Sequence, residues 1–81
     1  MVSLFGWGWK IRRLRRRWDR LREKALKKSE PARAEILQKL DVIENKIRTL
    51  EEQQPGIVLR ARLAKEVEID LAEIDALLKE K

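Results

Sequence analysis

The chain has 81 residues and no cysteine or histidine, and its 20 lysines and arginines outnumber 14 acidic residues, giving a net charge of +6. This length allows one small domain at most, without disulfides or Cys/His metal ligands to stabilise it. No apolar run reaches about 18 residues, which excludes a membrane-spanning helix, and the charged residues follow the first apolar ones instead of preceding them as in a secretory signal. We therefore expect a protein of the cytoplasm or of a virion.

Residues 1–9 combine large aromatic side chains with Gly6 and Gly8. Because glycine is conformationally permissive and weakens helices, we expect this stretch to form an N-terminal arm outside regular helix. The aromatic residues of the arm are Phe5, Trp7 and Trp9.

Residues 10–28 are predicted to form an Arg-rich amphipathic helix. Apolar residues recur at spacings of three and four and fall on one narrow stripe at about 100° per residue. The first 28 residues hold eleven lysines and arginines against Asp19 and Glu23, a net charge of +9, whereas residues 29–81 have a net charge of −3. The stripe consists of Trp7, Ile11, Leu14, Trp18, Leu21 and Ala25.

Residues 29–81 are predicted to form an antiparallel helical hairpin with coiled-coil-like packing, which makes the expected fold class all-α. Pro31 suits a first helical turn that Ser29 or Glu30 can cap, and Pro55 ends the first helix. A loop of about three residues makes two helices of similar length antiparallel neighbours. The expected inner positions are Ile36, Leu40, Ile43, Ile47 and Leu50 in the first helix, and Leu63, Val67, Leu71, Ile74 and Leu78 in the second.

The last helix has a second apolar face, nearly opposite the first. A helix with two apolar faces needs two neighbours: one can be the preceding helix, and the other is either the first helix or another subunit. We favour a contact with another subunit of a homo-oligomer for this face. The face consists of Val58, Ala61, Ile69, Ala72 and Ala76.

The concentration of charge in the first helix indicates a polyanionic partner, because nine net charges within 28 residues repel one another unless an anion is nearby. Arginine predominates over lysine there, and its planar fork suits phosphate. No Asn or Gln on the basic face is placed to read bases, so we expect sequence-independent binding of a DNA or RNA backbone, in a coat, packaging or nucleoprotein role that includes virions. The expected phosphate contacts are Arg12, Arg13, Arg16, Arg17, Arg20 and Lys24.

An anionic membrane surface is the alternative partner. Tryptophan and arginine are typical of interfacial helices, and Phe5, Trp7, Trp9 and Trp18 are the side chains that would insert. A narrow stripe suits a helical partner better than a lipid layer, and it favours core positions for Trp7 and Trp18. A third interpretation is a basic helix bound in the groove of an acidic protein.

Enzymatic activity is not expected. The chain has no His, Cys or Tyr, which excludes Ser/His and Cys/His nucleophiles, and it has no glycine-rich phosphate loop. We therefore expect no catalytic residue, no metal and no cofactor.

Overall fold

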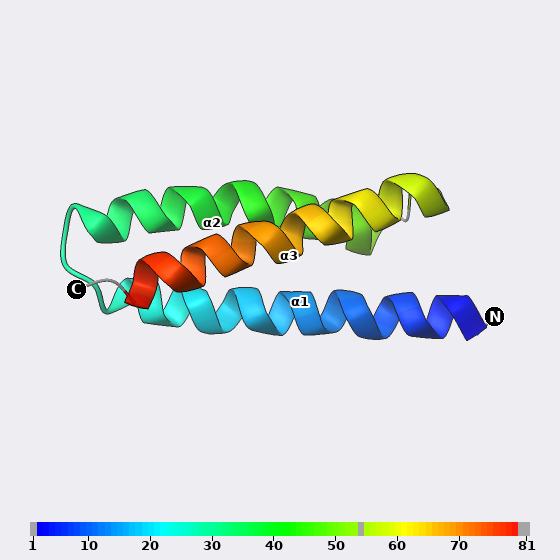
Figure 1. Ribbon diagram of the computed structural model, residues 1–81, viewed down its shortest axis with the longest axis horizontal. Helices are drawn as coiled ribbons and strands as arrows, with labels where there is room; N and C mark the ends of the chain where they lie inside the picture. Colours follow the sequence, from blue (N-terminus) through cyan, green and yellow to red (C-terminus); the bar gives the residue numbers. More distant parts are fainter. Residues whose placement is uncertain (1, 54, 80–81) are drawn as a thin grey trace.

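The computed structural model consists of three α-helices that follow one another along the chain (Figure 1). Helix α1 spans Val2–Leu26, α2 spans Ala32–Arg48 and continues into a π-helical turn, η1, at Thr49–Gln53, and α3 spans Ile57–Lys79. The structure describes residues 2–53 and 55–79, and side chains from residue 8 onward within these ranges. The described residues form helices and turns and no strand, so the all-α prediction is confirmed.

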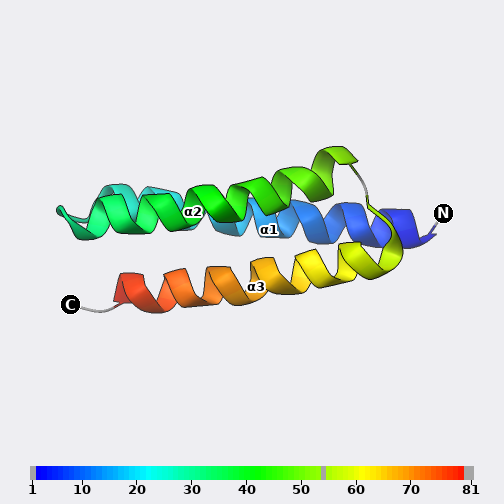
Figure 2. The same ribbon diagram turned by 90° about the horizontal axis from the view of Figure 1, so that it is seen from above.

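Each of the three helices contacts the other two. Consecutive helices run in opposite directions, and all three follow the long axis of a rod of 45 × 17 × 16 Å (Figure 1, Figure 2). Helix α1 is therefore an integral part of the bundle, with one side packed against both α2 and α3.

The N-terminal arm is helical. Helix α1 begins at Val2, so the prediction that Gly6 and Gly8 hold residues 1–9 outside regular helix is wrong. A glycine costs a helix only about 1 kcal/mol relative to alanine, and unlike proline it removes no hydrogen-bond donor. Two glycines are therefore too weak a signal to end a helix that the following residues favour strongly.

The N-cap residue of helix α2 is Pro31 and not the predicted Ser29 or Glu30, but the side chain of Glu30 does bind the first turn. One carboxylate oxygen of Glu30 accepts hydrogen bonds from the backbone N–H of Ala34 at 3.2 Å and from Nε of Arg33 at 3.1 Å. The first N–H groups of a helix have no partner within the helix, and a side-chain oxygen satisfies one of them here. Glu30 thus stabilises the first turn of α2.

A single hydrophobic core runs between the helices. All five inner positions predicted for α2 and η1 are buried, and so are Val67, Leu71 and Ile74 of α3. In α3, Leu63 and Leu78 are partly buried and pack against this core, and Ala64 is a core residue that the sequence did not predict. Apolar residues lie on several sides of α3, so its spacing does not determine which side faces inward. The core residues from α1 are Leu14, Trp18, Leu21 and Ala25.

Candidate nucleic-acid interface

Trp18 joins the inner side of α1 to α2. Its side chain is 6% exposed, and its indole Nε1–H donates a hydrogen bond of 2.7 Å to the backbone carbonyl of Leu40. The core position favoured by the stripe is therefore confirmed. Trp18 cannot enter a membrane interface, as the alternative function requires, while α1 stays in the bundle.

Arg15 lies at the edge of the same stripe and is held by acidic residues of α2 and η1. Its Nε and Nη2 donate to the two carboxylate oxygens of Glu51 at 3.2 and 2.9 Å, and its Nη1 lies 3.6 Å from Glu44. The guanidinium carbon is 5.3 Å from the ring centroid of Trp18. The hydrogen bond to Glu51 raises the pKa of Arg15 despite its partial burial. This arginine therefore serves the fold.

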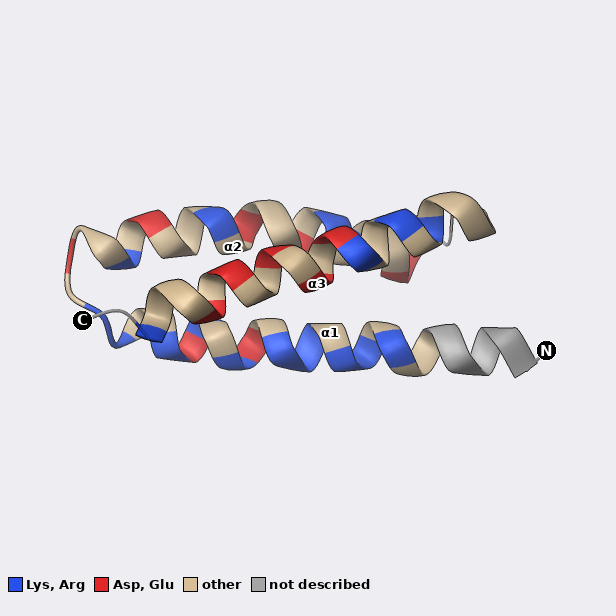
Figure 3. Cartoon of the chain, in the orientation of Figure 1, with Lys and Arg blue, Asp and Glu red and all other residues tan. Residues whose placement is uncertain are grey.

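From Lys10 onward, the exposed side of α1 carries basic residues (Figure 3). The six predicted phosphate contacts are among them: Arg16 points away from α3, Arg13 and Arg17 extend toward it, and all six are exposed to solvent except for the half-buried Arg17. Within the described part of the chain, none of the six forms an ion pair with a carboxylate. Their charge is thus available to an external anion. The six residues are Arg12, Arg13, Arg16, Arg17, Arg20 and Lys24.

Lys46 of α2 differs from these six cations because it forms ion pairs with carboxylates of α3. Nζ of Lys46 lies 3.0 Å from Asp70 and 3.2 Å from Glu66. The hydrogen bond to Asp70, followed by that to Glu66, raises the pKa of Lys46 against the opposing effect of burial. Asp70 and Glu66 of α3 therefore neutralise a lysine of α2, and neither forms an ion pair with the six cations of α1.

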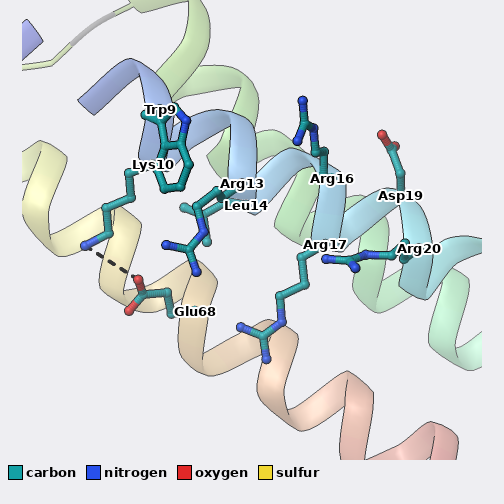
Figure 4. Close-up of a pocket in the computed structure, with 9 residues that line it drawn as sticks. All are labelled: Trp9, Lys10, Arg13, Leu14, Arg16, Arg17, Asp19, Arg20 and Glu68. Carbon is teal, nitrogen blue, oxygen red and sulfur yellow. Dashed lines mark ion pairs between the residues drawn. The ribbon is translucent and has the colours of Figure 1, made fainter. Parts of the chain in front are cut away.

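An open groove of ≈ 1050 Å³ runs along the exposed side of α1, and Glu68 of α3 completes its lining (Figure 4). Arg13 and Arg17 extend from α1 toward α3, whereas Arg16 points away on the outer side. Five cations and two carboxylates line the groove, and one of these carboxylates, Glu68, lies 3.5 Å from Nζ of Lys10. The lining therefore has a net positive charge. Its residues are Trp9, Lys10, Arg13, Leu14, Arg16, Arg17, Asp19, Arg20 and Glu68.

Trp9 is a large aromatic residue at one end of this groove, and 62% of it is exposed. The guanidinium carbon of Arg13 lies 5.1 Å from its ring centroid. The sequence places Trp9 outside the stripe, which agrees with its exposure. Phe5 and Trp7, the other two aromatic residues of the predicted arm, lie outside the described side chains.

The outward face of α3 is also exposed. Val58 is 77% and Ile69 51% exposed, and the three alanines predicted beside them are exposed as well. The single chain therefore leaves the predicted subunit interface uncovered. These alanines are Ala61, Ala72 and Ala76.

The groove includes residues that the sequence did not single out. Lys10 and Glu68 belong to it, and Glu68 lies 48 residues beyond Arg20, the last groove residue of α1. No local pattern could have joined Glu68 to α1, because the contact depends on how the helices pack.

The described residues form neither a metal site nor a membrane-spanning helix. Among residues 2–53 and 55–79, no three acidic side chains converge as metal ligands would. No described helix is both long and apolar enough to span a bilayer.

Comparison of the chain with protein-family models, curated proteins and solved structures finds no match. Function is therefore inferred from the geometry and charge of α1 and α3.

Proposed function

We propose that this protein is a non-enzymatic assembly protein that binds a nucleic-acid backbone, without sequence specificity, through the outer side of α1. The observation that carries the proposal is the row of six cationic side chains without carboxylate partners among the described residues. Such a protein would coat or package DNA or RNA, in a virion or another nucleoprotein.

The spacing of the charges supports a phosphate chain as the partner. Arg12 and Lys24 are twelve residues apart, which corresponds to about 18 Å of helix. Six cations over this distance give one positive charge per about 3 Å. One strand of duplex DNA has a phosphate per about 3.4 Å of axis, so the two charge densities are comparable.

The membrane-surface alternative is less well supported. An interfacial helix buries its apolar side in lipid, but the apolar side of α1 is already occupied by the bundle core, including Trp18. Binding would have to open the bundle or rely on Trp9 and the undescribed side chains before it. We therefore favour the nucleic-acid backbone.

Two variants of equal charge test the proposal. Arg16→Gln with Arg20→Gln removes two unpaired cations from α1, and Lys39→Gln with Arg48→Gln removes two exposed cations from α2. We expect the α1 variant to reduce the slope of log affinity against log salt by about 1.5–2, and the α2 control to leave it nearly unchanged. The measurement is fluorescence anisotropy of labelled DNA at several salt concentrations.

Equal losses in the two variants would show that only net charge matters and would refute a specific role for α1. Unchanged binding by the α1 variant would refute the proposal outright. Anionic and neutral vesicles in parallel titrations test the alternative, because insertion shifts the tryptophan emission to the blue and survives moderate salt.

We further propose that α2 and α3 act as a coiled-coil-like hairpin, whose outward face on α3 binds a second copy of the chain. Lys65 and Glu73 lie four residues on either side of the exposed Ile69, and neither has a charged partner among the described residues. In a two-fold antiparallel pair centred on Ile69, each Lys65 would lie opposite Glu73 of the other copy. This self-complementarity favours a second copy over an unrelated partner.

Charge reversal tests the subunit contact. We expect Lys65→Glu and Glu73→Lys each to weaken self-association, and the two together to restore it, because the exchanged charges again face each other. Sedimentation at tens of micromolar measures the oligomeric state. A folded monomer of the unaltered chain, without a partner, would refute the contact.

A further inference from the structure

The groove along α1, which Glu68 of α3 borders, offers two kinds of contact to one ligand. Arg13, Arg17 and Arg20 supply guanidinium groups along one wall, and Trp9 supplies an exposed indole at one end. Trp9 and Arg20 are eleven residues apart, or about 16 Å along the helix. A ligand lying in the groove would therefore meet several cations and one aromatic face.

The aromatic residue distinguishes between forms of nucleic acid. In a duplex the faces of the bases are stacked on one another, so an indole beside the backbone gains little. In a single strand the bases are free to stack on aromatic side chains while a basic groove follows the phosphates. Arg13 against the Trp9 ring reinforces this arrangement, because an arginine beside an aromatic ring can contact both a base and a phosphate.

The acidic residues of the groove do not oppose this arrangement. Lys10 offsets Glu68 at 3.5 Å, and Asp19 points away from α3, on the outer side of α1. The part of the groove between Trp9 and Arg17 is therefore positive, with the apolar side chain of Leu14 also in its lining.

From this juxtaposition we infer that the groove binds single-stranded nucleic acid, with phosphates on Arg13, Arg17 and Arg20 and a base stacked on Trp9. The inference rests on the proposed function and specifies its ligand. Stacking does not depend on base identity, so binding remains independent of sequence.

A strand without bases separates stacking from charge. The probes are a labelled oligothymidylate, an abasic strand of the same length and a duplex of that length, each titrated against the unaltered full chain, Trp9→Ala and Arg13→Gln with Arg17→Gln. We expect Trp9→Ala to lower affinity for the oligothymidylate about tenfold and to leave affinity for the abasic strand unchanged. The arginine variant should weaken binding of all three probes.

Controls keep the result interpretable. Trp9→Phe should retain most of the affinity because it keeps an aromatic face, and Val42→Ala, which alters an exposed apolar residue of α2, should have no effect. Circular dichroism of each variant verifies the helical fold.

Three outcomes would overturn the inference: equal losses on the oligothymidylate and the abasic strand, no loss with Trp9→Ala, or tighter binding of the duplex than of the single strand. In all three, the arginine variant shows whether backbone binding still stands. If that variant also binds every probe normally, the proposed function fails together with the inference.

Discussion

Helix α1 contains two arginine–tryptophan contacts of similar geometry in different surroundings. Arg15 lies 5.3 Å from the ring of Trp18, and Arg13 lies 5.1 Å from that of Trp9. Trp18 is buried and Arg15 is bound to Glu51, whereas Trp9 is exposed and Arg13 has no carboxylate partner among the described residues. The same pair of residue types therefore holds the bundle together on one side of the helix and is available to a ligand on the other.

The largest expected effect concerns the two tryptophans. We expect Trp18→Ala to lower the free energy of unfolding by about 3–5 kcal/mol, because it leaves a large cavity in the core. Trp9→Ala should change it by less than about 0.5 kcal/mol, because that side chain is exposed. Urea unfolding followed by circular dichroism measures both. Similar losses in the two variants would remove the distinction between the contacts.

Substitution of the two arginines should show the same order of stability losses as the tryptophans, larger for Arg15 than for Arg13, but with a smaller difference. Arg15→Met is expected to cost about 1 kcal/mol of stability, since a bidentate, partly buried ion pair exceeds most surface pairs. Arg13→Met should cost almost none, yet it should reduce the salt slope of nucleic-acid binding by about 0.7–0.9, which Arg15→Met should leave unchanged. Urea unfolding and anisotropy titrations test the two halves separately, and a stability loss with Arg13→Met would contradict the comparison.

The smallest expected effect extends the comparison to Lys46, a cation whose partners lie in its own chain. Its raised pKa means that its contribution to stability is fully present below pH 10.5 and is lost as the pH rises through the folded-state pKa. We expect Lys46→Met to cost about 0.2–1 kcal/mol near neutral pH, with the difference from the unaltered protein shrinking above pH 10.5. Urea unfolding at several pH values measures this difference, and one that persists at high pH would point to packing of the lysine stem instead.

The sequence predicts well what depends on local spacing. The five inner positions of α2 and η1 and the stripe of α1 from Leu14 to Ala25 are buried as expected. Arg15 and Arg16 are adjacent in a run of three arginines, and their different angular positions on the helix separate a contact within the fold from a side chain exposed to solvent. The partner of Arg15 is 36 residues away, and a one-turn shift of α1 against η1 would change it. Composition and spacing cannot specify that register.

The rod shape bears on how copies would be ordered on a strand. Helix α1 lies along the 45 Å axis, so a strand following its basic side would run parallel to the whole molecule (Figure 1). Each bound copy would then point one way or the other along the strand, head to tail or head to head with the next. A two-fold contact between α3 helices would join copies of opposite polarity, so a filament built from both contacts would have no overall direction.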